Sequence, residues 1–275
     1  MSGAIIMDVN NNFNAKIVAV GAWGQEFRNW QDLQNLLANH EWQDDGAKGP
    51  KPEIIPANER RRAPLPVRLA VESSWQATQQ STFQAEDLSC VFVSALGDTQ
   101  LTDYMCKVLA GENKQLSPTK FHNSVHNAAA GYWTISTGCM QSANSIAGYE
   151  ESVSLALLEA LTQINLEQQP VLLTFYDAPV SKVLQDLLKN EYPFAVSLVI
   201  VPEQADCAGQ KISVSVQNRE QKWSELESTN NTLRAIYEAT PTARILALLE
   251  KYGKGEVTQL SMPLSQTTSL DIRLG

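Results

Sequence analysis

Residues 116–161, LSPTKFHNSVHNAAAGYWTISTGCMQSANSIAGYEESVSLALLEAL, carry the pattern that decides the fold. Ser117-Pro118 marks a turn, and the small residues that follow predict a helix over about 127–136. A short strand over about 143–147 and a second helix beginning at Glu150 complete the unit. The order helix, strand, tight turn and helix is typical of a layered α/β protein.

The rest of the chain continues this alternation. Apolar runs predict strands, and apolar residues three and four positions apart predict helices. Strands are expected at Ala15–Val20, Leu88–Leu96, Pro170–Phe175, Phe194–Val201 and Ile212–Val216. Helices are expected at Phe27–Leu37, from Pro64 to about Trp75, and at Leu101–Ala110, Ser181–Leu188, Asn230–Ala239 and Pro241–Tyr252, with a long surface loop over His40–Pro56. Strands separated by helices indicate parallel pairing and right-handed crossovers.

Several features of the central segment together resemble the ketosynthases of the thiolase superfamily. They are Ser117-Pro118, Asn127, Ala129-Ala130-Gly131, Asn144-Ser145-Ile146 and Leu157-Leu158-Glu159-Ala160. The resemblance covers most of the first two hundred residues. It implies an α/β fold that is a single thiolase-type half, a mixed five-stranded sheet with helices on both faces, plus a C-terminal helical extension. Residues 1–202 would form the ketosynthase N-terminal-like domain, and residues 203–275 an extension packing on the same core.

The resemblance departs from the family at Glu150. Ketosynthases place a nucleophilic cysteine at this position, where a helix N-terminus lowers the pKa of a thiol. A carboxylate is equally stable at a helix N-terminus but is a poor acyl acceptor. Glu150 and Glu151 are thus either two stabilising acids in a first helical turn or the mark of a lost nucleophile, and the two readings are compatible.

The histidines lead to the same expectation. Ketosynthases use two histidines from the second half of their fold, whereas this chain has only His40, His122 and His126. The catalytic set cannot be assembled within this chain, so we expect a non-catalytic subunit. His122 and His126 are four residues apart but lack a nearby third ligand, and we expect no metal site and no cofactor.

The resemblance also implies a partner interface. In ketosynthase dimers the segment before the small-residue helix lines the neighbour's acyl tunnel, which here assigns Lys120, Phe121, Asn123 and Asn127 to interface and tunnel. The following strand pairs across the dimer, which assigns Asn144, Ser145 and Ile146. An edge strand of this kind has to be paired, covered or charged, and a partner chain is the natural solution.

Four arginines stand close together in an otherwise acidic chain: Arg60, Arg61, Arg62 and Arg68. One interpretation is a solvated loop whose arginines pair with nearby acids. The functional interpretation is a docking patch for an acidic acyl carrier protein, because guanidinium groups bind carboxylates and phosphates well.

The composition limits the other possibilities. The formal net charge is −9 and the pI is about 4.9, so nucleic acid and anionic membranes would be repelled. The sequence contains no long apolar run and no signal-peptide pattern, and we expect a cytoplasmic protein. Cys90, Cys106, Cys139 and Cys207 form no metal-binding spacing, and cysteines of this kind are mostly small buried hydrophobes.

Three functions follow from these observations. The first is a silent chain-length-factor subunit that pairs with an active β-ketoacyl synthase, with HNSVHNAAAGYW looking most like the ketosynthase-like proteins of aryl polyene clusters. The active partner would act on acyl carrier protein thioesters. The second is a malonyl-thioester decarboxylase or acyl-handling enzyme that uses Glu150 as an acid or base. The third is a homodimeric carrier-protein binding module.

Overall fold

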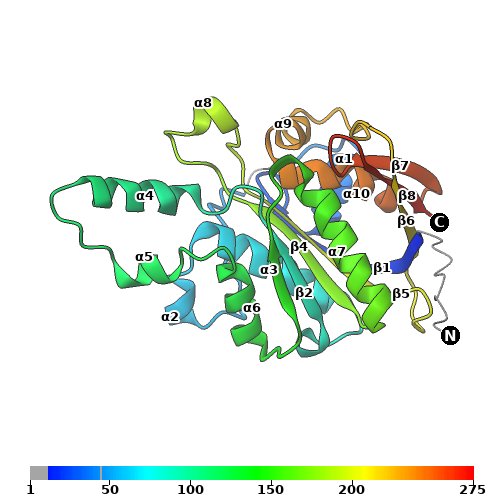
Figure 1. The fold of residues 1–275 in the computed structure, drawn as a ribbon, viewed down its shortest axis with the longest axis horizontal. Coiled ribbons are helices and arrows are strands. Elements are labelled where there is room, and N and C mark those ends of the chain that lie inside the picture. Colours follow the sequence, from blue (N-terminus) through cyan, green and yellow to red (C-terminus); the bar gives the residue numbers. More distant parts are fainter. Residues whose placement is uncertain (1–11, 44) are drawn as a thin grey trace, which may run out of the picture.

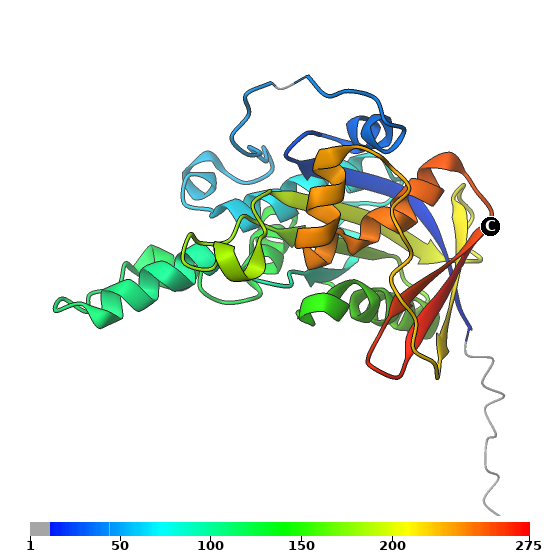
Figure 2. The ribbon, with the colours of Figure 1, turned by 90° about the horizontal axis from the view of Figure 1, so that it is seen from above.

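The computed structural model describes residues 12–43 and 45–275, and its centre is one mixed eight-stranded sheet in the order β3-β2-β4-β5-β1-β6-β8-β7 (Figures 1 and 2). β2, β3 and β4 pair in parallel and the remaining pairs are antiparallel. The strands are β1 Asn12–Gly24, β2 Ser89–Val93, β3 Ala143–Ile146, β4 Val171–Asp177, β5 Phe194–Pro202, β6 Gln210–Gln217, β7 Thr258–Pro263 and β8 Ser269–Leu274. The predicted α/β class is therefore confirmed.

Helices cover both faces of the sheet, as predicted. The longer helices are α1 Trp30–Leu37, α3 Leu65–Gln79, α4 Thr99–Ala110, α6 Ala128–Thr137, α7 Ser152–Glu167, α9 Asn231–Ala239 and α10 Leu246–Lys254. The shorter ones are α2 Ala57–Arg60, α5 Pro118–His122 and α8 Gln185–Leu188, with 3-10 turns η1 Ala85–Asp87, η2 Tyr149–Glu151 and η3 Pro241–Ile245. In β2, Val91 and Val93 face the core under α7, and Cys90 and Phe92 face the core under α3 and α6. Because β2 is buried on both faces, its sequence is apolar without alternation.

The sheet has more strands than the five that were predicted. Five strands, β3-β2-β4-β5-β1, come from the part of the chain before residue 203, and three more follow it. β6 was predicted, whereas β7 and β8 were not. Their alternating residues Leu260, Met262, Leu270 and Ile272 are buried on one face only, so each strand shows a short period-two pattern that is weaker than the apolar runs of the central strands.

The C-terminal segment, residues 203–275, is not the purely helical extension that was predicted. It adds β6, β8 and β7 to the sheet edge and places η3 against α7 and α10 against α1. The Ser154 hydroxyl on α7 donates to the carbonyl of Pro263 on β7. The strands on either side of residue 202 thus share one sheet and one core, and the division of the chain at that residue remains a prediction.

The two outer edges of the sheet differ. At β7, the N–H of Ser224 donates to the Ser261 carbonyl at 3.1 Å, and the N–H of Ser261 donates to the Ser224 hydroxyl at 2.9 Å. This covers the β7 edge with the chain around Ser224. At the other end, β3 pairs with β2 alone among the strands that the structure describes. β3 is consequently the open edge.

The predicted surface loop over His40–Pro56 is irregular in its described part and is fastened to the body by Arg28. The guanidinium of Arg28 contacts both oxygens of Asp45 at 2.9 and 2.5 Å and lies 4.7 Å from the Trp23 ring and 5.1 Å from the Trp42 ring. Its hydrogen bonds lower the pKa of the Asp45 carboxyl to about 2. One cation thereby joins the loop to the end of β1.

A buried carboxyl at the end of β4 joins the two parts of the chain. Asp177 is fully buried and accepts hydrogen bonds from the Ser94 hydroxyl at 2.8 Å, the Leu96 N–H at 3.2 Å and the Thr242 hydroxyl at 2.7 Å. Burial raises the pKa of Asp177 to about 6, although the hydrogen bonds act in the opposite direction. The ends of β2 and β4 and the start of η3 therefore meet at one acid.

We expect Asp177→Asn to remove a pH-dependent cost of folding. Because the folded protein holds the proton more tightly, its free energy of unfolding falls as the pH rises from about 4 to about 6. The difference from the ordinary pKa of 3.8 corresponds to about 3 kcal/mol. Urea unfolding at pH 4.5 and pH 7.5 should therefore show the variant gaining stability relative to the parent at the higher pH. The exposed control Asp206→Asn should follow the parent at both pH values, and parallel profiles for Asp177→Asn would contradict the assignment.

Candidate functional site

The turn that follows β3 contains Glu150, the residue that the resemblance assigns to the nucleophile position. Glu150 lies half-buried in the 3-10 turn η2, and α7 begins only at Ser152, one short turn later than predicted. The N–H of Gly148 donates to the Ser152 hydroxyl at 3.0 Å, which closes the turn. Tyr149 adopts a left-handed backbone conformation with φ 49°, which is strained for a residue with a large side chain.

β3 presents main-chain groups to the open edge. β2 donates from Cys90 N to the Ser142 carbonyl at 2.8 Å and from Ser94 N to the Ile146 carbonyl at 3.3 Å. Because alternate residues of a strand face the same neighbour, Asn144 also faces β2, and the main-chain groups of Ser145 point outward. The Asn144 side chain donates to Glu159 on α7 at 2.7 Å, which fixes the edge strand to the helix behind it.

The predicted interface segment forms an arm, α4 and α5, that projects from the body (Figure 1). Phe121 and His122 lie in the short helix α5. The reason is local, because the Ser117 hydroxyl caps the helix and Pro118 occupies its first turn. Lys120 places its ammonium 3.5 Å from the Tyr104 ring of α4, so it is held within the arm.

Several large apolar side chains between residues 121 and 149 are exposed. Phe121 is 60% exposed, Ile135 84% and Met140 93%. Val125 and Tyr149 are also exposed, and Asn127 is exposed at the N-cap of α6 with no side-chain capping bond. Val125 and Ile135 lie together in the wall of one cavity of about 480 Å³, and exposed apolar side chains that lie together indicate a surface that another molecule covers.

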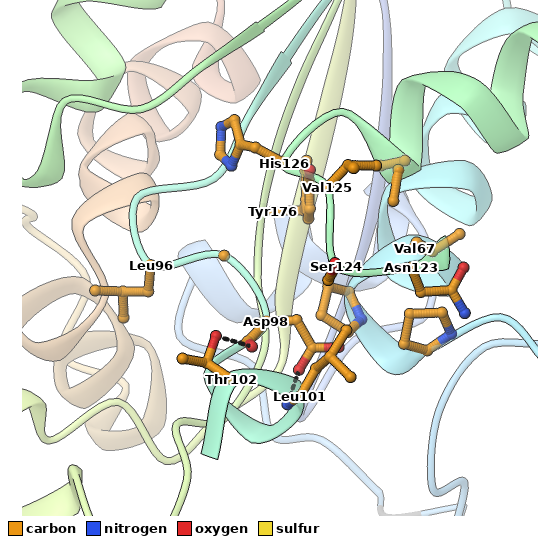
Figure 3. A pocket seen from close by; sticks show the side chains of 15 residues that line it. Val67, Leu96, Asp98, Leu101, Thr102, Asn123, Ser124, Val125, His126 and Tyr176 are labelled. Carbon is orange, nitrogen blue, oxygen red and sulfur yellow. Dashed lines mark hydrogen bonds between the residues drawn. The ribbon is translucent and has the colours of Figure 1, made fainter. Parts of the chain in front are cut away.

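Asn123 lies where three cavities meet. Cavities of about 170, 480 and 360 Å³ all have Asn123 in their walls. The side chain of Asn123 is buried, donates to the Arg62 carbonyl at 3.1 Å and accepts from the Tyr132 hydroxyl at 3.3 Å. Figure 3 shows the smallest cavity, beside the ends of the parallel strands, with Asp98, Leu101, His126 and Tyr176 in its wall. Glu150 lines none of these three cavities.

The four arginines divide into two pairs. Arg60 donates to the Pro52 carbonyl and Arg68 to the Pro50 carbonyl, both at 3.1 Å, so these two hold the preceding loop. Arg61 and Arg62 are exposed, Arg61 contacting Asn58 and Arg62 lying 3.5 Å from Glu59. Any docking role would therefore depend mainly on Arg61 and Arg62.

His122 and His126 are both exposed, and His126 lines the smallest cavity. Within the described part of the chain, no three His, Cys, Asp or Glu side chains are placed to hold a metal ion. None of the described helices is both long and apolar enough to cross a membrane.

Comparison with known proteins gives the family. The model of the family described as "Beta-ketoacyl synthase, N-terminal domain" matches residues 29–252. The chain belongs to this family. Among the curated proteins, none matches the sequence.

Solved structures of this family share the fold. A structure of the ketosynthase ApeO in complex with its chain length factor ApeC from Xenorhabdus doucetiae has a matching chain with a TM-score of 0.70 and 19% identity, covering 94% of this chain and 99% of that chain. The ishigamide ketosynthase/chain length factor gives a TM-score of 0.70 at 11% identity, covering 95% and 99%. A β-ketoacyl synthase from Burkholderia phymatum gives 0.58 at 12% identity, covering 84% and 70%.

The β-ketoacyl synthase fold was recognised from the motif between Ser117 and Ala160. The sequence predicted neither that Asn123 lies in the walls of three cavities nor that Asp177 is buried. The cavities around Asn123 carry no sequence signal, because a cavity wall is built from segments far apart in the chain. Asp177 is the last residue of the apolar strand β4, and that position was the available hint.

Proposed function

We propose that the chain is a catalytically silent subunit of the chain-length-factor type that pairs with an active β-ketoacyl synthase. The observation that carries the proposal is the turn after β3, which contains Glu150 and no cysteine, in a sequence with no histidine beyond residue 126. We assign Glu150 to the nucleophile position on the resemblance alone. The acyl thioester would have to form on the partner. The role of this chain is then structural and steric.

The open edge of β3 supports the pairing. The outward main-chain groups of Ser145 require a hydrogen-bonding partner, and strand addition to an exposed edge supplies one. Exposed Phe121 lies on the arm, Val125 in the connection between α5 and α6, and Met140 in the turn before β3. They supply apolar area of the kind that a stable interface needs. The covered edge at β7 leaves β3 as the edge available for a partner strand.

The cavities around Asn123 suggest how this chain affects the product. Lys120, Phe121, Asn123 and Asn127 stand on the face that we assign to the partner, and three of them line the cavities. They would form part of the acyl tunnel wall and limit chain length by steric contact. The class of reaction is elongation of carrier-bound acyl chains by malonyl units, of the aryl polyene or a related polyketide type.

The test is assembly in solution. The chain is co-expressed with the β-ketoacyl synthase encoded nearest to it, and the purified material is analysed by size-exclusion chromatography with light scattering. A one-to-one complex is expected. A stable homodimer that ignores the synthase would favour the carrier-binding module, and an isolated chain that decarboxylates malonyl thioester, with loss of activity in Glu150→Gln, would favour the enzyme.

Carrier protein docking gives a further prediction. The double charge reversal Arg61→Glu/Arg62→Glu should weaken binding of acyl carrier protein to the assembled pair by roughly tenfold at low salt, because two attractive charge contacts become repulsive. Fluorescence anisotropy with labelled carrier protein at two salt concentrations measures this effect. Lys211→Glu, on β6, is the control, and equal affinity for all three proteins would remove the arginines from the docking site.

A further inference from the structure

Two buried cysteines lie on either side of one carbonyl oxygen. The Cys90 sulfur, on β2, lies 3.2 Å from the Leu88 carbonyl oxygen, and the Cys139 sulfur, in the turn before β3, lies 3.4 Å from the same oxygen. Cys90 is fully buried and Cys139 is 4% exposed. They are far apart in the chain, yet the two sulfurs lie against one carbonyl oxygen.

The two thiols differ in pKa. A hydrogen bond from the Cys90 thiol is the main cause that lowers the pKa of Cys139 to about 6, with the Gln141 N–H assisting, while burial and the charges of Glu86 and Asp87 act against it. The same hydrogen bond, together with burial, raises the pKa of Cys90. One sulfur of the pair therefore favours the thiolate, and the other remains the protonated donor.

The surroundings leave Cys139 reachable after a small movement. Its neighbours Gly138 and Met140 are exposed, and Gly138 has the left-handed φ of 71° at the end of α6. The segment is a short connection between a helix and an edge strand, where local opening costs less than in the core. Cys90 lies within the β2 ladder and stays covered.

We propose that Cys90 and Cys139 form a redox-active dithiol that small disulfides oxidise to an intramolecular disulfide. This inference is independent of the proposed function. The Cys139 thiolate attacks one sulfur of glutathione disulfide, which forms a mixed disulfide and releases one glutathione thiolate. That thiolate takes up the Cys90 proton, and the Cys90 sulfur then attacks Cys139 and displaces the second glutathione. Two protein thiols are oxidised, and one glutathione disulfide is reduced to two thiols.

The experiment uses the full chain with Cys106→Ser and Cys207→Ser, so that only the pair remains of the four cysteines. The folded protein is incubated with glutathione disulfide, quenched in acid and analysed by intact mass spectrometry. The expected product has lost about 2 Da and both free thiols together, and peptide mapping joins Cys90 to Cys139. In the additional variant Cys90→Ala, the reaction should stop at a glutathione adduct on Cys139.

A second readout separates a redox pair from merely buried thiols. The rate of alkylation of Cys139 by iodoacetamide should reach half its plateau near pH 6 and shift to higher pH in Cys90→Ala, because the stabilising hydrogen bond is lost. Circular dichroism confirms that each variant is folded. The proposal is overturned if folded protein keeps both thiols free in glutathione disulfide while urea-unfolded protein reacts, or if the alkylation profile does not change in Cys90→Ala.

Discussion

Ser145→Pro should abolish assembly with the β-ketoacyl synthase while leaving this chain folded. The N–H of Ser145 points away from β2, so proline removes a group that only a partner strand can use, and its ring blocks the approach of that strand. Loss of the edge pairing should weaken the complex by at least roughly 100-fold, which corresponds to about 3 kcal/mol. Analytical ultracentrifugation of the mixed proteins measures the change.

Two controls make this result specific. Ser145→Ala keeps the main-chain N–H and should assemble normally. Asn144→Pro removes an N–H that faces β2 and should instead lower the thermal stability of the chain itself. Normal assembly of Ser145→Pro would show that β3 is not the contact strand, and the partner would then have to bind the arm alone.

Gly21→Ala should strongly lower the free energy of unfolding, although it adds only one methyl group. Gly21 lies in β1 where α3 crosses it, and an added Cβ would overlap the Ser73 carbonyl oxygen and lie 2.6 Å from the Ala77 nitrogen. Both are main-chain atoms of a helix that is fixed by the buried hydroxyls of Ser73, Ser74, Thr174 and Ser197. The helix cannot yield without opening this hydrogen-bonded cluster, so we expect a loss of about 3 kcal/mol or more.

Gly131→Ala is the matched control for this substitution. Gly131 lies within α6, and an added Cβ would meet no atom within 4 Å. Replacing glycine by alanine inside a helix should raise the free energy of unfolding by about 0.5 to 1 kcal/mol. Urea denaturation of both variants measures these opposite effects, and equal stability of Gly21→Ala and the parent would show that α3 does not lie this close to β1.

The sequence contained the central architecture because its signals are local. The apolar runs at Leu88–Leu96, Pro170–Phe175 and Phe194–Val201 became β2, β4 and β5, and the small-residue segment became α6. Buried strands have continuous apolar sequences, and short motifs specify turns. These signals were enough to predict the class, whereas the helices on both faces and the edge strand were expected from the resemblance to ketosynthases.

The remaining features depend on contacts between distant segments. β7 and β8 are half-buried, and their pairing with β6 could not be deduced from six-residue patterns. Arg60 and Arg68 resembled a docking patch in sequence, yet each is directed at a carbonyl of a preceding proline. Asn123 meets three cavities only because α3, α4 and α6 converge on it. Long-range packing decides each of these cases.

The most direct test of the central claim is a malonyl-condensation assay on the assembled pair, with acyl carrier protein thioesters as substrates. We expect the pair to elongate the chain, this subunit alone to be inactive, Glu150→Gln to leave turnover unchanged, and replacement of the synthase's nucleophilic cysteine to abolish it. Turnover by this subunit alone, or loss of activity in Glu150→Gln with the pair still assembled, would contradict the account and place the chemistry on this chain.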